Sequence, residues 1–207
     1  MVFKSIGDDE ATILLAIMEM HNKSKPFHLD PTFSCGSFYK TGKVPVPELR
    51  YDINVADPRV AFADVRNLPL ADRSVGSIIF DPPFMFNPHG TALQKNAAAR
   101  RFSMFSTFAD LQSVYTGALV EFSRILKPRG IVAFKCQDYT DSKTTMLHCL
   151  VFNWATDLGF YAKDIFIRYR NNGPAYNPNL TQRHARKFHS YWWVFQLGRA
   201  VTLEDRT

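Results

Sequence analysis

The chain has 207 residues, of which 46% are hydrophobic and 14% aromatic, which suffices for the core of one larger domain. Its 25 Lys and Arg exceed its 19 Asp and Glu, and the net charge of +6 favours polyanionic partners. Three cysteines without metal-ligand spacing exclude a disulfide or zinc framework, and no apolar run reaches the roughly 18 residues of a membrane span. The start lacks the apolar region of a signal peptide, so we expect a cytoplasmic protein without metal or membrane contact.

The first half of the chain reads as one helix followed by four short strands. Residues 9–21 have an acidic start and apolar side chains at helical spacing, which predicts a helix. Strands are predicted at 26–30, 49–53, 60–65 and 76–81, and their acids are Asp30, Asp52, Asp64 and Asp81. Parallel strands bring their carboxyl ends to one rim of a sheet, where open α/β sheets bind ligands. We therefore expect a line of acids on one rim, although each acid could also only cap a loop.

The second half is more regular. The apolar face of residues 107–126 predicts a helix, which "KPRG" ends before a strand at 131–136. A second helix is predicted at 144–159, followed by strands at 160–169 and 188–197. These last strands predict a closing antiparallel hairpin on a mostly parallel sheet. Residues 38–49 make a poor helix, so one face of the sheet is expected to depend on the helix at 9–21 or on a partner, which favours dimerisation.

The stretch "SIIFDPPF" places an acid at the end of an apolar strand. Pro82 and Pro83 fix the backbone and prevent a helix, so Asp81 is expected to stand on a rigid tip. Phe84 follows and offers a flat apolar surface beside a hydrogen-bond acceptor, unless it is only a core residue. This combination suits a planar ring that carries an amine.

The "DPPF" string after an apolar strand resembles the catalytic motif of class I S-adenosylmethionine-dependent amino-methyltransferases, above all DNA adenine-N6 methyltransferases. The resemblance covers roughly residues 26–136 and implies a Rossmann-like fold. The length of the chain leads us to expect a single methyltransferase domain over residues 1–207, with no room for a separate target-recognition domain. It also implies a catalytic group made of Asp81, Pro82, Pro83 and Phe84.

Further segments extend the resemblance to the cofactor site. "LDPTFSCGSFY" is similar to the family's cofactor loop, "LRYDI" to the strand whose acid holds the ribose, and "FADVRNLP" to the segment that meets the adenine. The loop departs from the family in having one glycine where two are usual. The implied S-adenosylmethionine contacts are Asp30, Thr32, Phe33, Gly36, Asp52, Asp64 and Val65.

Two polar segments follow the predicted strands at the same rim. Residues 85–106 and 168–189 mix basic side chains with aromatics and amides, which suits phosphate contacts and base stacking, although a solvated basic loop has the same composition. The candidate substrate contacts are Lys95, Arg100, Arg101, Arg183, Arg186 and Lys187.

The sequence as a whole favours methylation of adenine N6 in DNA. The same chemistry on RNA or on cytosine N4 remains an alternative, because the motif meets an amine rather than a whole nucleotide. An inactive scaffold subunit of a larger methyltransferase is a third reading, which the reduced glycine content of the cofactor loop favours. Selectivity would come from the basic loops, from a homodimer or from a partner subunit.

Overall fold

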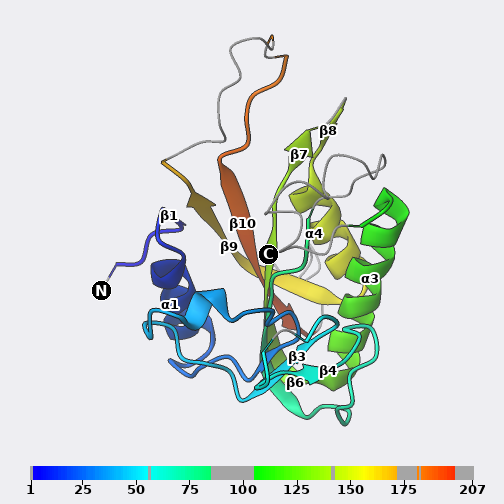
Figure 1. The fold of residues 1–207 in the computed structure, drawn as a ribbon. Coiled ribbons are helices and arrows are strands. Elements are labelled where there is room, and N and C mark those ends of the chain that lie inside the picture. Colours follow the sequence, from blue (N-terminus) through cyan, green and yellow to red (C-terminus); the bar gives the residue numbers. More distant parts are fainter. Residues whose placement is uncertain are drawn as a thin grey trace, which may run out of the picture.

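A computed structural model describes residues 2–55, 57–84, 105–140, 143–171, 181 and 183–198. These residues form an eight-stranded sheet with the order β1-β9-β10-β6-β5-β2-β3-β4 (Figure 1). Neighbouring strands are parallel except at β10, which is antiparallel to both β6 and β9. The predicted mostly parallel sheet with a C-terminal antiparallel hairpin is therefore confirmed. The strands of this sheet are β1 (Ile6–Gly7), β2 (Leu29–Asp30), β3 (Leu49–Asp52), β4 (Ala61–Phe62), β5 (Val75–Phe80), β6 (Leu126–Cys136), β9 (Phe160–Tyr169) and β10 (His189–Leu197).

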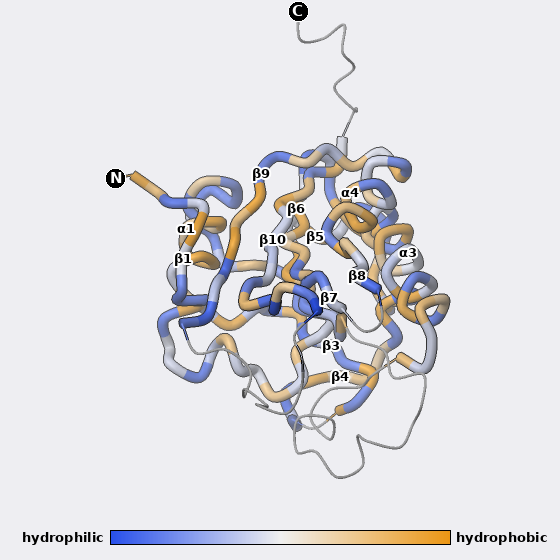
Figure 2. The backbone as a smooth tube through the Cα atoms, turned by 90° about the horizontal axis from the view of Figure 1, so that it is seen from above, coloured by the Kyte–Doolittle hydropathy of each residue, from blue (hydrophilic) through white to orange (hydrophobic). Residues whose placement is uncertain are grey.

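Helices cover both faces of this sheet. Seen from above, α1 lies on one side of the strands and α3 and α4 lie on the other (Figure 2). None of the helices that the structure describes is both long enough and apolar enough to cross a membrane. The remaining elements are α1 (Glu10–His21), the short 3-10 helix η1 (Ser37–Tyr39), α3 (Phe108–Ile125), α4 (Leu147–Asp157) and a separate two-stranded sheet of β7 (Tyr139–Thr140) and β8 (Thr144–Thr145).

Helix α3 builds the larger half of the core. Thr107 and Asp110 form a reciprocal capping box that fixes where the helix begins. Its apolar positions recur every three or four residues, so one stripe is fully buried against the sheet. In the centre of this core, Phe80 of β5 packs edge-on against Phe122 and Phe134, with ring centroids 5.1 and 4.8 Å away. Strand β5 is thereby fixed from one face.

Helix α1 and the segment after β2 cover the other face. Asp9 caps α1 by accepting a hydrogen bond from the backbone N–H of Ala11 at 3.3 Å. Leu14 and Ile17 of α1 are fully buried in a second core that includes Trp192 of β10. Between β2 and β3 the chain forms only η1, as its two prolines led us to expect. Of the two covers expected for this face, residues 9–21 or a partner, the structure shows the first.

Several element boundaries differ from the sequence prediction. Strands β2 and β4 are shorter than the predicted 26–30 and 60–65, so Asp64 lies beyond the end of β4. Thr144 and Thr145 form strand β8 instead of the first turn of α4, and the hydroxyls of Thr140 and Thr144 lie 3.0 Å apart across the small sheet. β-Branched residues lose rotamer freedom in a helix, which favours the strand. Strand β6 begins at Leu126 rather than at 131, so "KPRG" lies within it, and the pairing with β5 shifts register between Leu126 and Ile131.

The carboxyl ends of the parallel strands define one rim of the sheet. Asp30 and Asp52 are the last residues of β2 and β3, and Asp81 follows β5 directly. The β9–β10 hairpin opens at the same rim, because Tyr191 near the start of β10 pairs with Cys136 at the end of β6. The structure thus brings three of the four predicted acids and the start of β10 to one end of the molecule.

Candidate active site

The Asp-Pro-Pro turn after β5 is held at both of its ends. The backbone N–H of Asp81 donates to Thr32 Oγ1 at 3.0 Å, which ties the turn to the loop after β2. The hydroxyl of Tyr115 in α3 donates to the carbonyl oxygen of Pro83 at 2.9 Å. The prolines have no N–H of their own and restrict the backbone further. The turn is therefore a rigid tip on the central strand.

Phe84 continues from this turn toward α3. Its side chain is half-buried and packs against the core beneath α3, while Pro82 is buried. The four residues of the motif consequently stay together at the rim, with part of the phenylalanine surface still exposed.

A lysine that the sequence analysis did not single out lies beside Asp81. Lys135 of β6 places its Nζ atom 3.4 Å from Asp81 Oδ2 and 3.0 Å from Glu10 Oε1, at the first residue of α1. Only 13% of the lysine side chain is exposed. A charged residue inside the buried strand "IVAFKC" was the signal for it, because a lysine is rarely buried without a partner.

The groups around Asp81 shift the pKa of its carboxyl in opposite directions. Burial raises the pKa of the Asp81 carboxyl, the Lys135 cation lowers it, and the Glu10 carboxylate raises it again. The net direction is upward, although 27% of the Asp81 side chain is exposed. A carboxyl in this setting can accept hydrogen bonds as an anion and exchange a proton nearer to neutral pH than an exposed aspartate.

The loop after β2 is organised around a buried carboxyl. Asp30 is 2% exposed and accepts hydrogen bonds from the Tyr39 hydroxyl at 2.6 Å and from the Thr32 backbone N–H at 3.0 Å. Burial raises its pKa from 3.8 to about 7, against the lowering effect of both hydrogen bonds. Phe33 stacks on Tyr39 with centroids 5.2 Å apart. The buried Asp30 carboxyl therefore holds the loop in place through its hydrogen bonds to Thr32 and Tyr39.

Gly36 gives the same loop its tight turn. Its φ angle is +63°, and a Cβ at this position would lie 2.8 Å from the ring of Phe33. Both the backbone angle and the close contact exclude a side chain here. The single glycine of the loop is thus a structural requirement.

Asp52 links the end of β3 to this loop. Its Oδ2 accepts from the Ser34 backbone N–H at 2.8 Å, and its Oδ1 accepts from the Asn54 N–H at 2.7 Å. The carboxylate therefore lies where the loop after β2 and the end of β3 meet. This is a position from which an acid can reach a ligand bound across both segments.

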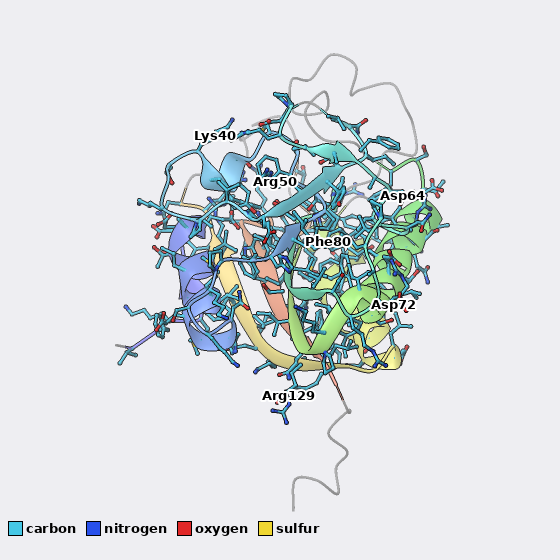
Figure 3. All side chains as sticks on the ribbon, turned by 90° about the horizontal axis from the view of Figure 1, so that it is seen from below. Lys40, Arg50, Asp64, Asp72, Phe80 and Arg129 are labelled. Carbon is cyan, nitrogen blue, oxygen red and sulfur yellow. The ribbon has the colours of Figure 1, made fainter. Side chains whose placement is uncertain are left out.

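Asp64 has a different environment. Its carboxylate is paired with Arg66, with a distance of 2.6 Å from Oδ2 to Nη2 and 3.0 Å from Oδ1 to Nε. The hydrogen bond from Arg66 lowers the pKa of Asp64. The neighbouring Val65 is buried in the core beneath α3. Figure 3 shows Asp64 toward α3 and Phe80 nearer the centre of the molecule.

The basic candidates divide into two groups. Lys95, Arg100 and Arg101 lie outside the described residues. Arg183 is exposed, and Arg186 and Lys187 are half-buried in the segment that leads into β10. The Arg170 N–H donates to the Phe188 carbonyl at 2.8 Å, which continues the hairpin beyond its strands. This second group therefore lies in the segment that extends beyond the β9–β10 hairpin, which opens at the rim.

A polar cluster at the same rim also escaped the sequence analysis. Asp138, only 3% exposed, accepts from the backbone N–H of His148 at 3.1 Å and lies 2.8 Å from its Nδ1. The His148 ring stacks on Tyr191 at 4.3 Å between centroids, and the Tyr191 hydroxyl donates to Asp138 at 3.3 Å. His189 Nε2 lies 2.9 Å from the same hydroxyl. The cluster joins α4 to the start of β10.

One surface depression lies away from this rim. It has a volume of about 440 Å³ and is lined by residues at the amino ends of the strands, including His28, Ser77 and Lys127. Of the residues that the structure describes, none of the motif residues Asp81 to Phe84 lines it. We therefore place the candidate site at the opposite end, around Asp81.

Comparison with solved structures agrees with the fold. A proposed sarcosine dimethylglycine methyltransferase from Galdieria sulphuraria matches with a TM-score of 0.54 and 13% identity, covering 92% of this chain and 86% of that one. The protein TrmN from Thermus thermophilus matches with a TM-score of 0.51 and 15% identity, covering 91% of this chain and 49% of that one. The chain thus has the Rossmann-like fold of class I methyltransferases.

A proposed DNA modification methylase from Thermus thermophilus is also similar, at 18% identity over 70% of this chain. Its TM-score of 0.46 is too low to support an inference, and the match spans 57% of that chain, less than two thirds. No family model matches the sequence. No curated protein matches it either.

Proposed function

We propose that this chain is an S-adenosylmethionine-dependent N-methyltransferase that acts on an exocyclic amine of a nucleobase, most of all adenine N6 in DNA. The observation that carries the proposal is the Asp-Pro-Pro-Phe turn, tied at Asp81 to Thr32 and at Pro83 to Tyr115. It stands at the end of the central strand, on the rim where open α/β sheets bind ligands.

The segments around this turn fit the cofactor. Asp52 would bind the ribose hydroxyls, Asp64 and Val65 would border the adenine, and the loop with Asp30, Thr32, Phe33 and Gly36 would hold the methionine part. The fit rests on the donor set: Asp52 is fixed by two backbone N–H groups where β3 meets the loop, and Gly36 keeps the loop tightly turned. S-adenosylmethionine, when bound, supplies a methyl group carried by a positively charged sulfur.

The motif residues would prepare the amine for reaction. An exocyclic amine is a poor nucleophile because its lone pair is delocalised into the ring. The Asp81 carboxylate and the Pro82 carbonyl would accept its two N–H groups and orient the lone pair, while Phe84 stacks on the base. The nitrogen must also lose one proton, for which Asp81 stands as an acceptor, because its pKa is raised by burial.

Nucleic acid is the proposed substrate because basic side chains adjoin the same rim. Arg183, Arg186 and Lys187 precede β10, whose first residues lie beside the end of β6. They would contact phosphates, and a base from a duplex would be flipped out to reach Asp81. Lys95, Arg100 and Arg101 would act from the segment after the motif. A second copy or a partner subunit could add selectivity.

An inactive scaffold is the second candidate, and two contacts favour it. Asp30 is already bonded to Tyr39 and Thr32, and Asp64 is already paired with Arg66. A cofactor that needs these carboxylates would have to compete with those partners. Asp81, by contrast, lies beside a cation, as an active acceptor requires.

A nucleoside assay separates these proposals. The protein is incubated with deuterium-labelled S-adenosylmethionine and with adenine- or cytosine-containing DNA and RNA, single- and double-stranded, and digested nucleosides are measured by mass spectrometry. Labelled N6-methyladenine in DNA is expected. Label only in RNA or only on cytosine N4 would transfer the proposal to that substrate. Cofactor binding in calorimetry without any labelled nucleoside, or no cofactor binding at all, would favour the scaffold.

A further inference from the structure

Lys135 occupies a closed position between two carboxylates and two aromatic rings. Its Nζ atom lies 4.9 Å from the centroid of Phe38 and 5.3 Å from that of Trp192. At these distances the ring faces attract the ammonium group. Together with the carboxylates of Glu10 and Asp81, they hold the ammonium group from several sides.

Glu10 is itself fixed in place. The indole Nε1 of Trp192 donates to Glu10 Oε1 at 2.7 Å, and Arg168 Nε lies 3.6 Å from Glu10 Oε2. The carboxylate of Glu10 therefore cannot turn away from Lys135 without losing the indole hydrogen bond. Helix α1 thus anchors a cation on β6, although the two residues are far apart in the sequence.

The cation is shared unequally between the two acids. Its distance to Glu10 is 3.0 Å and its distance to Asp81 is 3.4 Å, so Glu10 holds the closer contact. One oxygen of Asp81 faces Lys135 while the side chain keeps 27% of its surface exposed. Asp81 is consequently oriented by the cation and still open to a ligand.

We infer that Lys135, anchored by Glu10, is a positioning residue that sets the charge and the orientation of Asp81 for contact with the substrate amine. The inference rests on the proposed function, because it assigns Asp81 to the amine. It extends that function to α1, because Glu10 at the start of this helix would influence the charge of Asp81 through Lys135.

The charged groups around Asp81 predict the direction in which each substitution shifts its titration. Lys135 faces it from β6, Glu10 from α1 and the buried Asp30 from β2, while the Tyr115 phenol of α3 is held to Pro83. Removing Lys135 leaves Asp81 with Glu10 and no cation, so Asp81 should take up a proton at higher pH. Removing the charge of Glu10 leaves the whole cation to Asp81, so Asp81 should hold its charge to lower pH.

Carboxyl NMR measures these directions without any substrate. Protein labelled with ¹³C at the aspartate carboxyls is titrated, and the Asp81 signal is assigned by its loss in Asp81→Asn. We expect the Asp81 titration to move to higher pH by about one pH unit or more in Lys135→Met and to lower pH in Glu10→Gln. Lys135→Arg should stay close to the wild type, and so should Lys127→Met, an exposed lysine elsewhere in the same strand.

The test is decisive because Lys135→Met and Glu10→Gln are expected to shift the Asp81 titration in opposite directions. A merely structural role for Lys135 would leave the titration of Asp81 unmoved, or move it in the same direction in Lys135→Met and Glu10→Gln, and either result would overturn the inference. Should Lys135→Met not fold, Glu10→Gln still gives the sign, because it keeps the shape of the side chain and removes only its charge. Lys135→Arg then serves as the charge-conserving control.

Methyl transfer gives a second readout. In an active wild type, the acidic limb of the pH profile of kcat should move to higher pH in Lys135→Met and to lower pH in Glu10→Gln, with the KM for the cofactor unchanged. Unchanged pH profiles of kcat in active variants would contradict the positioning role of Lys135 but not the proposed function. An inactive wild type whose Asp81 titration still shifts as expected would contradict the proposed function and leave the positioning role in place.

Discussion

The hydroxyl of Tyr115 lies 2.9 Å from the carbonyl oxygen of Pro83 and donates a hydrogen bond to it. Tyr115 is fully buried in the middle of α3, so the position of the Asp-Pro-Pro turn is set by the helix that packs beneath it. Burial raises the pKa of the Tyr115 phenol well above its ordinary value, and the hydroxyl remains a donor throughout the physiological range.

Tyr115→Phe should weaken both stability and turnover. The change removes the donor but keeps the ring, so the free energy of unfolding should fall by about 1 to 3 kcal/mol because the Pro83 carbonyl loses its partner. Urea unfolding measures this loss. Methyl transfer should slow while the affinity for S-adenosylmethionine stays near that of the wild type. An unchanged rate would mean that the turn keeps its position without this bond.

The two acids proposed for the cofactor should differ in effect. Asp52→Ala should weaken S-adenosylmethionine binding by about 1.5 to 3 kcal/mol, because a carboxylate held by two backbone N–H groups is lost. Asp64→Ala should cost less, since Arg66 already pairs with this carboxylate. Isothermal calorimetry gives both dissociation constants. A larger loss for Asp64 than for Asp52 would reverse the proposed assignment.

Asp30 should make the stability of the protein depend on pH. Its pKa is raised from 3.8 to about 7 in the folded state, so the folded state binds its proton more tightly than the unfolded state does. The contribution of Asp30 to stability is therefore fully present below about pH 4 and is lost as the pH rises toward 7. The free energy of unfolding of the wild type, relative to Asp30→Asn, should fall across this window. A difference that rises with pH would contradict the raised pKa.

The basic segment before β10 should give nucleic-acid binding a steep salt dependence. Each neutralised phosphate releases counterions, so replacing Arg183 and Lys187 together by Ala should reduce the slope of log affinity against log salt by about two at most. Replacing Lys127 and Lys163, which are exposed elsewhere, serves as the matched control and should leave the slope unchanged. Equal slopes for both double variants would assign the phosphate contacts to other residues.

Much of the fold could be predicted from local patterns in the sequence. Strands β2 and β3 end at Asp30 and Asp52, and β5 ends directly before Asp81, where apolar runs meet an acid. Helix α3 follows its apolar stripe closely. Such periodicities are local, so a single segment contains the whole signal. The absence of a full helix between β2 and β3 likewise follows from the prolines in that segment.

The contacts that tune the site are not local. Lys135 meets Glu10 across more than a hundred residues, and Asp138 meets Tyr191 across the β6–β10 pairing. A linear pattern does not contain such pairings, because they depend on strand order and on which face each side chain takes. The Asp64–Arg66 pair is close in sequence, yet it was missed because a free acid was expected there.

Turnover by Asp81→Ala tests the central claim most directly. The side chain lies at the rim and forms its one described hydrogen bond to Lys135, so the variant should fold and should bind S-adenosylmethionine with nearly unchanged affinity. Transfer of label to the nucleobase amine should fall by about a hundredfold or more, as expected when an oriented acceptor is lost in the transition state. Asp157→Ala, an exposed acid at the end of α4, should remain as active as the wild type. Near-normal turnover by Asp81→Ala would contradict the account.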